Sequence, residues 1–240
     1  MSLVPFPLPL KGSDVLDEPG IFGSIFAPIE YILSVALNAL YSLVEIIGLP
    51  NYGLAIILLT ILIKILLHPL TKKQIESAKA MQRLQPQMKK IQEKYKGNQQ
   101  LMGQKMMELY KKEGASPASG CLPMLAQMPF LMGMYYTLYN FNYGGADPSF
   151  FWVPNLSEPD PVYVLPILSV VTTVLMQKTM SSSGTEMNPQ MKVMMMIMPL
   201  FIGWISLNFP AGLVLYWVVN NVVQIVQQLW MNRNDDKEAA

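Results

Sequence analysis

The stretch NYGLAIILLTILIKILLHPL, residues 51–70, contains only two basic or acidic side chains, Lys64 and His68. Twenty helical residues rise about 30 Å, the thickness of a bilayer's hydrocarbon core, so we predict a membrane-spanning helix. A charge at the bilayer centre costs about 2.5–3.5 kcal/mol on insertion scales, so Lys64 is expected to face water or a partner. The alternative is a lysine whose stem lifts its ammonium group to the headgroups, because Leu70 follows by only six residues.

Four more runs free of charged side chains follow this first one. They are 121–141, 161–177, 193–209 and 211–231, and each is long enough to cross a bilayer. The chain is 52% hydrophobic and only 14% charged, which leaves little sequence for a soluble core. We therefore predict an all-α integral membrane protein in which residues 51–231 form one core of five transmembrane helices. The one cysteine excludes an intramolecular disulfide.

The distribution of charge predicts the topology. Residues 72–113 contain eleven Lys or Arg and four Glu, a net charge of +7 in a chain of net charge +1. Residues 142–160 contain three acidic side chains and no basic one, whereas 178–192 and the C-terminal tail each carry basic residues. The positive-inside rule therefore places 72–113, 178–192 and the C-terminus in the cytoplasm, and 142–160 and the N-terminus outside.

Residues 25–50 are mostly apolar but carry a polar stripe. Tyr31, Ser34 and Asn38 recur at intervals of three and four, which predicts an amphipathic helix lying in the extracytoplasmic interface of the membrane. A sixth span is the alternative. Residues 1–24 are then an extracytoplasmic tail, and 232–240 a short cytoplasmic tail. The first twenty residues lack the apolar stretch of a signal peptide, so the tail is expected to cross unaided unless a native leader is missing.

The basic segment 72–113 has helical periodicity on both sides of a glycine turn at 96–98. This pattern predicts an antiparallel helical hairpin whose first arm is kinked or split at Pro86. Its basic faces would rest on anionic headgroups or contact a partner such as ribosomal RNA. Methionine is flexible and suits surfaces that accept many apolar helices, although ordinary core filling is the alternative. The methionines predicted to contact client helices are Met81, Met88, Met102 and Met106.

Polar side chains recur within the predicted spans. Those predicted to line a groove are Lys64, Thr60, Gln127, Thr173, Gln177, Trp217, Asn220, Asn221 and Gln224. Any single one of them would be explained by a hydrogen bond between helices. Together, on several spans and at similar depth, they predict a hydrated cavity open to the cytoplasm and the lipid. No carboxylate occurs in the five spans, so Lys64 is expected to meet water or an anionic ligand.

Catalysis is not expected. The sequence has no G-x-x-x-x-G-K-[ST] loop for a nucleotide, no cluster with metal-ligand spacing, and no serine motif to pair with its one histidine, His68. We therefore predict a protein that is not an enzyme and needs no cofactor or metal. DNA is not an expected partner.

The stretch NYGLAIILLTILIKILLHPLTKKQ (51–74) resembles the first core span of the Oxa/YidC/Alb family of membrane protein insertases. LQPQMKKIQEKY (84–95), GCLPMLAQMPFLMGMYYTLY (120–139), DPVYVLPILSVVTTVLMQK (160–178) and FPAGLVLYWVVNNVVQIVQQ (209–228) resemble the later blocks of the family, in order and spacing. The resemblance covers about residues 22–231. It is to the Gram-positive type of YidC, which lacks the large periplasmic domain.

The resemblance implies a bacterial cell-membrane protein that helps new membrane proteins enter the bilayer. A groove cation at Lys64 would draw in the acidic tail of a client, and Gln177 and Trp217 would line the groove. The client helix would then leave along the third and fifth spans. The implied partners are nascent membrane proteins, lipids, the ribosome, the targeting particle and the Sec translocon. A small-solute transporter and a non-translocating assembly chaperone stay open as alternatives.

The sequence departs from the family pattern at three places. Lys64 stands where most members have arginine, Ser116-Pro117 replaces the usual Asn-Pro, and the C-terminal tail is short. Lysine keeps the positive charge but lacks the forked guanidinium group, so the two residues are not strictly equivalent.

Overall fold

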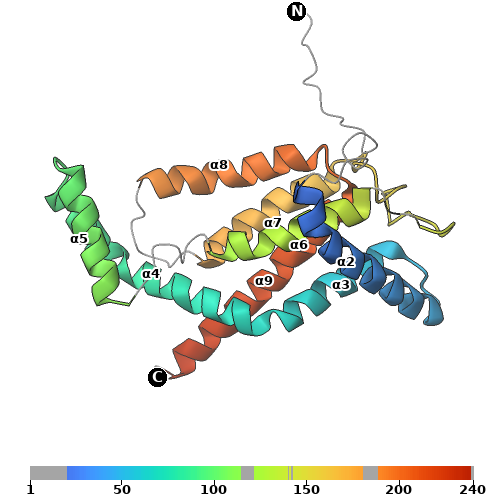
Figure 1. Ribbon diagram of the computed structural model, residues 1–240, viewed down its shortest axis with the longest axis horizontal. Helices are drawn as coiled ribbons and strands as arrows, with labels where there is room; N and C mark the ends of the chain where they lie inside the picture. The colour runs from blue at the N-terminus through green and yellow to red at the C-terminus, as the bar shows by residue number, and fades with distance from the viewer. Residues whose placement is uncertain (1–20, 115–121, 140, 142, 181–188, 239–240) are drawn as a thin grey trace, which may run out of the picture.

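The computed structural model describes residues 21–114, 122–139, 141, 143–180 and 189–238, and Figure 1 shows them as a helical bundle with one long helical arm. The helices of this part of the chain are α2 (Ile21–Ile46), α3 (Tyr52–Leu66), α4 (His68–Lys94), α5 (Gln99–Lys112), α6 (Leu122–Tyr139), α7 (Val164–Met180), α8 (Pro189–Ser206) and α9 (Ala211–Glu238). No strand forms among these residues beyond a single bridge between Phe150 and Val153. The predicted all-α class is confirmed.

The first predicted span is not one straight helix of twenty residues. α3 ends at Leu66, α4 begins at His68, and the two axes differ by 68°. Pro69 explains the break, because it lacks an N–H group and its ring clashes with the carbonyl four residues earlier, yet it fits the first turn of a new helix. The fifteen residues of α3 rise only about 22 Å.

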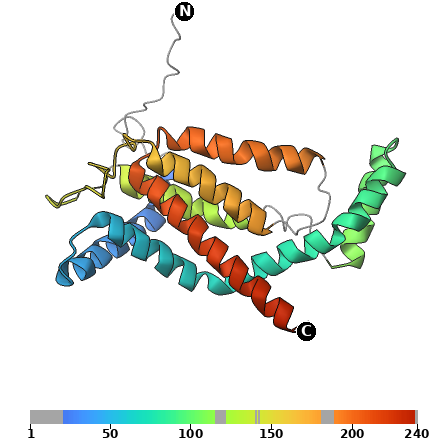
Figure 2. The same cartoon turned by 180° about the vertical axis from the view of Figure 1, so that it is seen from behind.

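α4 and α5 form the predicted helical hairpin. Leu84, Leu109 and Tyr110 are buried between them, and the Asn98 side chain caps α5 by accepting from the Leu101 N–H at 3.0 Å. Pro86 does not split the first arm, because α4 continues through it as a helix. Figures 1 and 2 both place α5 at the end of the molecule farthest from α2 and α3.

The main core joins α2, α3, α6 and α9. Its fully buried side chains include Leu37, Ile56, Met134 and Leu138. α2 packs on α6 and α3, and α9 packs along both α3 and α7. The segment between α6 and α7 closes one end of this core, because Leu156 is fully buried and its carbonyl accepts from the Gly212 N–H at 2.8 Å.

α7 lies between α8 and α9 in both views (Figures 1 and 2). The Asn221 amide of α9 donates to the hydroxyls of Thr172 and Thr173, at 3.2 and 3.0 Å. On the other side, Gly203 of α8 lets the two backbones approach, since an added Cβ would lie 2.3 Å from a methyl group of Val170. Small residues and side-chain hydrogen bonds are the usual means by which helices associate in lipid.

Only one described helix is long and apolar enough to cross a membrane by itself. It is Phe26–Ile46, within α2, and the bent pair α3 and α4 counts as a second if it is taken as one span. Val164–Thr179 and Met195–Ser206 are apolar but shorter. The five-span core, and the interfacial position of α2, therefore stay predictions.

Candidate functional site

A cavity of about 380 Å³ lies where α3, α4, α6, α7, α8 and α9 meet. Its polar lining consists of Lys64, Thr71, Gln74, Gln127, Thr173, Gln177, Tyr216, Trp217, Asn220, Asn221 and Gln224. Eight of the nine residues that the sequence places in a groove thus surround one space in the structure. Their role in binding a client stays a prediction.

Lys64 is the central residue of the cavity. Its side chain is only 7% exposed, and its Nζ donates to Gln224 Oε1 of α9 at 2.8 Å. The acceptor that the structure shows for this ammonium group is the neutral amide oxygen of Gln224, and no described carboxylate is seen in an ion pair with it. Lys64 is therefore a cation inside the protein that a neutral amide holds in place, rather than a side chain that extends to the surface.

Thr60 does not line the cavity. Its side chain is buried, and its hydroxyl donates to the Ile56 carbonyl at 2.7 Å within α3. The bond uses the donor of the hydroxyl inside its own helix, and the residue is not among those that line the cavity. Its spacing of one turn from Lys64 was insufficient evidence for a shared role.

Three polar lining residues were missed by sequence reasoning. Tyr216 is almost fully buried, and its hydroxyl accepts a hydrogen bond from the Gln127 amide, which joins α9 to α6. Thr71 and Gln74 are buried at the start of α4. Both residues follow the break at Leu67. Helical periodicity extended from Lys64 through this break therefore does not predict that they line the same cavity as Lys64. The one signal in the sequence was that Tyr216 is adjacent to Trp217, which was predicted to line the groove.

The remaining wall of the cavity is apolar. Leu131 comes from α6, Met176 from α7 and Ile205 from α8. Met128 of α6 and Phe201 of α8 line the cavity and are also exposed on the surface of the protein. The cavity therefore reaches the surface between α6 and α8, with polar groups inside and apolar groups at its edge.

His68 lies near the cavity but is not part of it. Its Nδ1 is 3.5 Å from the Gln227 amide nitrogen, and its ring centroid is 6.3 Å from that of Trp230. No cluster of three metal-ligating side chains occurs among the described residues. The partners that the structure shows for this histidine are thus an amide and an indole ring.

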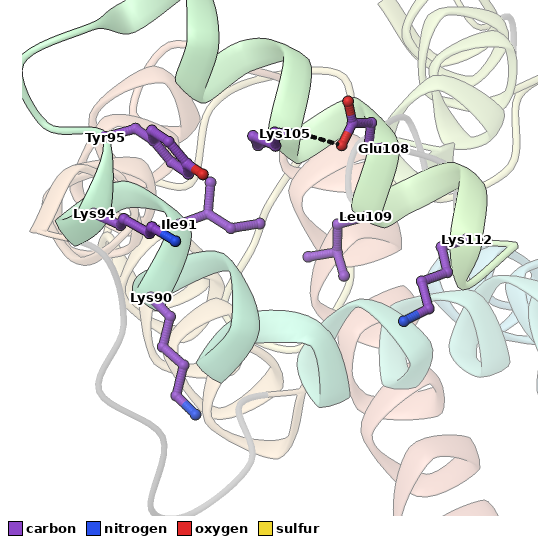
Figure 3. Close-up of a pocket in the computed structure, with 8 residues that line it drawn as sticks. All are labelled: Lys90, Ile91, Lys94, Tyr95, Lys105, Glu108, Leu109 and Lys112. Carbon is purple, nitrogen blue, oxygen red and sulfur yellow. Dashed lines mark hydrogen bonds and ion pairs between the residues drawn. The ribbon is translucent and has the colours of Figure 1, made fainter.

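A second depression, of about 320 Å³, lies near the tip of the hairpin (Figure 3). Lys90 and Lys94 line it from α4, Tyr95 from the position just after α4, and Lys105 and Lys112 from α5, together with three further residues, Ile91, Glu108 and Leu109. The 2.7 Å contact with Glu108 raises the pKa of Lys105. Four lysines against one carboxylate make the tip a basic surface, as the charge pattern predicts.

The hairpin methionines lie mostly between its arms. Met81, Met88 and Met106 pack against the small buried cluster of the hairpin, and the Tyr110 hydroxyl lies 3.7 Å from the Met88 sulfur. Their packing is explained by the core of the hairpin, which was the alternative explanation. Contact with a client at these three positions would require the arms to separate, and Met102 is half-buried on the second arm.

Comparisons with known proteins agree with this arrangement. The profile of the family described as "60Kd inner membrane protein" matches residues 42–238. The chain is 40% identical to the membrane protein insertase MisCA of Bacillus subtilis, over 99% of this chain and 92% of that protein. It is 44% identical to the membrane protein insertase YidC of Geobacter sulfurreducens, over 77% of this chain and 34% of that protein. It therefore spans nearly all of one relative and about a third of the other.

A solved structure shows the same fold. The chain resembles a crystal structure of an active YidC insertase with its first transmembrane domain resolved, at a TM-score of 0.63 and 27% identity. The similarity covers 86% of this chain and 46% of that one. The family profile, the Bacillus subtilis relative and the solved structure all indicate the family that the sequence motifs predict. This chain belongs to the YidC family of membrane protein insertases.

Proposed function

We propose that this protein helps newly made membrane proteins enter and fold in the bilayer. The observation that carries the proposal is Lys64, a buried cation whose hydrogen-bond acceptor is a neutral amide, in a cavity that reaches the surface. A charge left without a counter-charge in a site of low dielectric attracts an incoming anion strongly. An acidic tail of a client supplies that anion. No step of this process requires bond chemistry, so the protein is not expected to be an enzyme.

Five spans are part of the proposal, namely α3 with the start of α4, α6, α7, α8 and α9. The hairpin lies at one end of the molecule and the segment between α6 and α7 at the other, which suits a cytoplasmic and an extracytoplasmic position respectively (Figures 1 and 2). The N-terminus is then outside and the C-terminus cytoplasmic, in the bacterial cell membrane. α3 and α7 are shorter than a bilayer is thick, which favours local thinning of the membrane.

The client helix is proposed to leave between α6 and α8. This differs from exit along the third and fifth predicted spans, which are α7 and α9. Those two helices pack along each other and are joined by Asn221, whereas α6 and α8 are not a packed pair among the described residues. Both α6 and α8 present apolar side chains at the cavity edge, such as Met128 and Phe201. An apolar helix can pass there from the cavity into lipid without exposing polar groups.

Nascent membrane proteins and membrane lipids are the proposed partners of the core. The basic tip of the hairpin supports contact with the ribosome, and the targeting particle and Sec translocon are further candidates. Deletion of residues 75–111, bridged by a Gly/Ser linker, should leave a folded bundle that inserts clients poorly. Full insertion after the deletion would limit the hairpin to fixing the topology.

Reconstitution into liposomes tests the function. A short single-span client with an acidic tail should become protected from added protease when this protein is present. Lys64→Arg should retain that protection and Lys64→Glu should abolish it, because the attraction changes sign. A client with a neutral tail is the matched control and should respond less. Uptake of small solutes without tail protection would identify a transporter, and neither result would identify an assembly chaperone.

Solvent access tests the cavity separately. Cysteines at 64, 177, 217 and 224, with Cys121 replaced, should react with a membrane-impermeant maleimide from the cytoplasmic side. Val222→Cys, on an exposed face of α9, is the control, because a thiolate scarcely forms in hydrocarbon. Equally slow labelling at all five positions would contradict a water-filled groove.

A further inference from the structure

The segment between α6 and α7 presents aromatic side chains to the outside of the protein. Phe151 is 83% exposed, Tyr163 is 54% exposed, and Trp152 and Val162 are exposed as well. We call these four residues the outer patch. Large apolar side chains exposed together in this way usually mark a surface that something covers.

The backbone at the outer patch is held in an unfavourable conformation. Among the described residues, Phe151 and Tyr163 are the two non-glycine residues with positive φ, at 51° and 60°. This region suits glycine or asparagine, and a bulky residue there is strained. Each residue thus combines strain with exposure of an aromatic ring. Strained residues concentrate where the surrounding structure and a functional requirement hold them.

The turn that carries Phe151 and Trp152 is rigid. Phe150 and Val153 exchange two backbone hydrogen bonds, of 2.8 and 2.9 Å, and both side chains are buried below the turn. Phe150 packs so tightly on α3 that a Cβ at Gly53 would lie 2.1 Å from its ring. The exposure of Phe151 is therefore built into the fold.

Asp160 connects the two halves of the outer patch. Its buried carboxylate accepts from the Trp152 indole N–H at 3.2 Å, and from the backbone N–H groups of Val162 and Leu165 at 3.0 and 2.7 Å. Leu165 is the second residue of α7. The aromatic turn is thus fastened to the start of α7, the helix that supplies Thr173 to the cavity.

We propose that the outer patch is a docking site for the extracytoplasmic headgroup interface of the lipid bilayer. Two observations favour lipid over another protein. The exposed apolar surface continues from Tyr163 onto α7, where Ile167, Val171 and Leu175 are exposed on successive turns. Trp and Tyr rings also prefer the membrane–water interface. The proposal rests on the proposed topology, which places this end of α7 outside.

This docking is hydrophobic and independent of lipid charge. Asp147 and Glu158 are exposed on the same segment, and residues 142–160 carry no basic side chain. Anionic lipids therefore gain nothing by electrostatics. Through Asp160, the anchored turn sets the depth of the α7 terminus in the membrane, and with it the thickness of the barrier beyond the cavity.

Fluorescence of Trp152 tests the proposal. The variant W204F/W217F/W230F leaves it as the single tryptophan, in vesicles of phosphatidylcholine brominated either near the headgroup end or near the tail end of the acyl chains. We expect the shallow bromines to quench about twofold more than the deep ones, as for an interfacial ring. Adding phosphatidylglycerol or salt should not change the ratio. A protein that retains only Trp204, an exposed residue of α8, is the control for lipid access.

A second variant separates the patch from the fold. Phe151→Asp in the single-tryptophan protein should reduce shallow quenching about twofold, since a carboxylate is excluded from the interface. Strong quenching by aqueous iodide with no effect of brominated lipid would overturn the proposal and assign the outer patch to water or to a soluble protein. Deeper than shallow quenching would overturn it too. Neither readout depends on insertion activity, so failure here is distinct from failure of the proposed function.

Discussion

Substitution of Gln224 tests how the cavity tolerates a buried charge. Lys64 is only 7% exposed as a residue, and its ammonium group donates to the Gln224 side-chain carbonyl at 2.8 Å. Gln224→Leu removes this acceptor and leaves the charge in place. A hydrogen bond to a charged group contributes about 1.5–3 kcal/mol net, so we expect the free energy of unfolding to fall by about 2 kcal/mol.

Lys64→Met provides the opposite half of a double-mutant cycle. It removes a charge whose presence in a membrane costs about 2.5–3.5 kcal/mol, but leaves the Gln224 amide unpaired at a cost of about 1–3 kcal/mol. The two effects nearly cancel, so this single variant should be about as stable as the wild type. The double variant K64M/Q224L removes both groups and should exceed the wild type by about 1 kcal/mol, as found when buried polar pairs are replaced by apolar residues.

Reversible unfolding in mixed micelles, followed by circular dichroism, measures these differences. The double variant should gain stability and lose insertion of clients with acidic tails, which separates the functional role of Lys64 from a structural one. A stability change below about 0.5 kcal/mol for Gln224→Leu would refute the reasoning about stability, because water of the groove would then reach the buried ammonium group and replace the amide at little cost. A double variant less stable than the wild type would refute it as well.

Three smaller perturbations follow from the packing and the charge pattern. Gly203→Leu should destabilise the bundle by about 1–3 kcal/mol, because its Cβ would collide with Val170. Gly103→Leu is the control and should not destabilise the protein, since a Cβ there meets open space. Thermal unfolding compares the two variants. Asn221→Leu should cost about 1 kcal/mol in the same measurement, through the loss of its bonds to two threonine hydroxyls of α7. Lys94→Glu at the hairpin tip should weaken ribosome co-sedimentation and reduce its salt dependence.

The helices of the core are the part of the fold that sequence predicts well. Long apolar runs with glycine, proline or charge at their ends leave little choice of structure. The ends of α6, α7 and α8 lie within a few residues of their predicted runs, and α9 starts at the predicted residue but continues seven residues past the end of its run. The hairpin is predictable for the same reason, since its apolar residues recur every three or four positions on both arms. Local periodicity decides both features.

Tertiary contacts decided what the sequence left open. Thr60 and Lys64 are one turn apart on α3, yet only Lys64 reaches the cavity; Thr60 is buried, with its hydroxyl donating to a carbonyl of its own helix. In the sequence, Phe151 falls in the predicted connection 142–160 and Tyr163 near the start of the predicted span 161–177, and nothing singles either residue out. Their positive φ angles and their exposure depend on the hydrogen bonds of the buried Asp160 and of the Phe150–Val153 turn. No local sequence pattern predicts these bonds.

The break before Pro69 changes the electrostatic position of Lys64. In one continuous helix ending at Leu70, Lys64 would lie more than one turn before the C-terminus, where the helix dipole stabilises a cation little. Because α3 ends at Leu66, Lys64 lies in the last turn, where the unpaired carbonyl groups of the C-terminus favour a cation by about 0.3–1 kcal/mol. The same break opens the space that Thr71 and Gln74 line from α4. One proline thus both lowers the cost of the buried charge and helps to shape the cavity in which that charge is proposed to act.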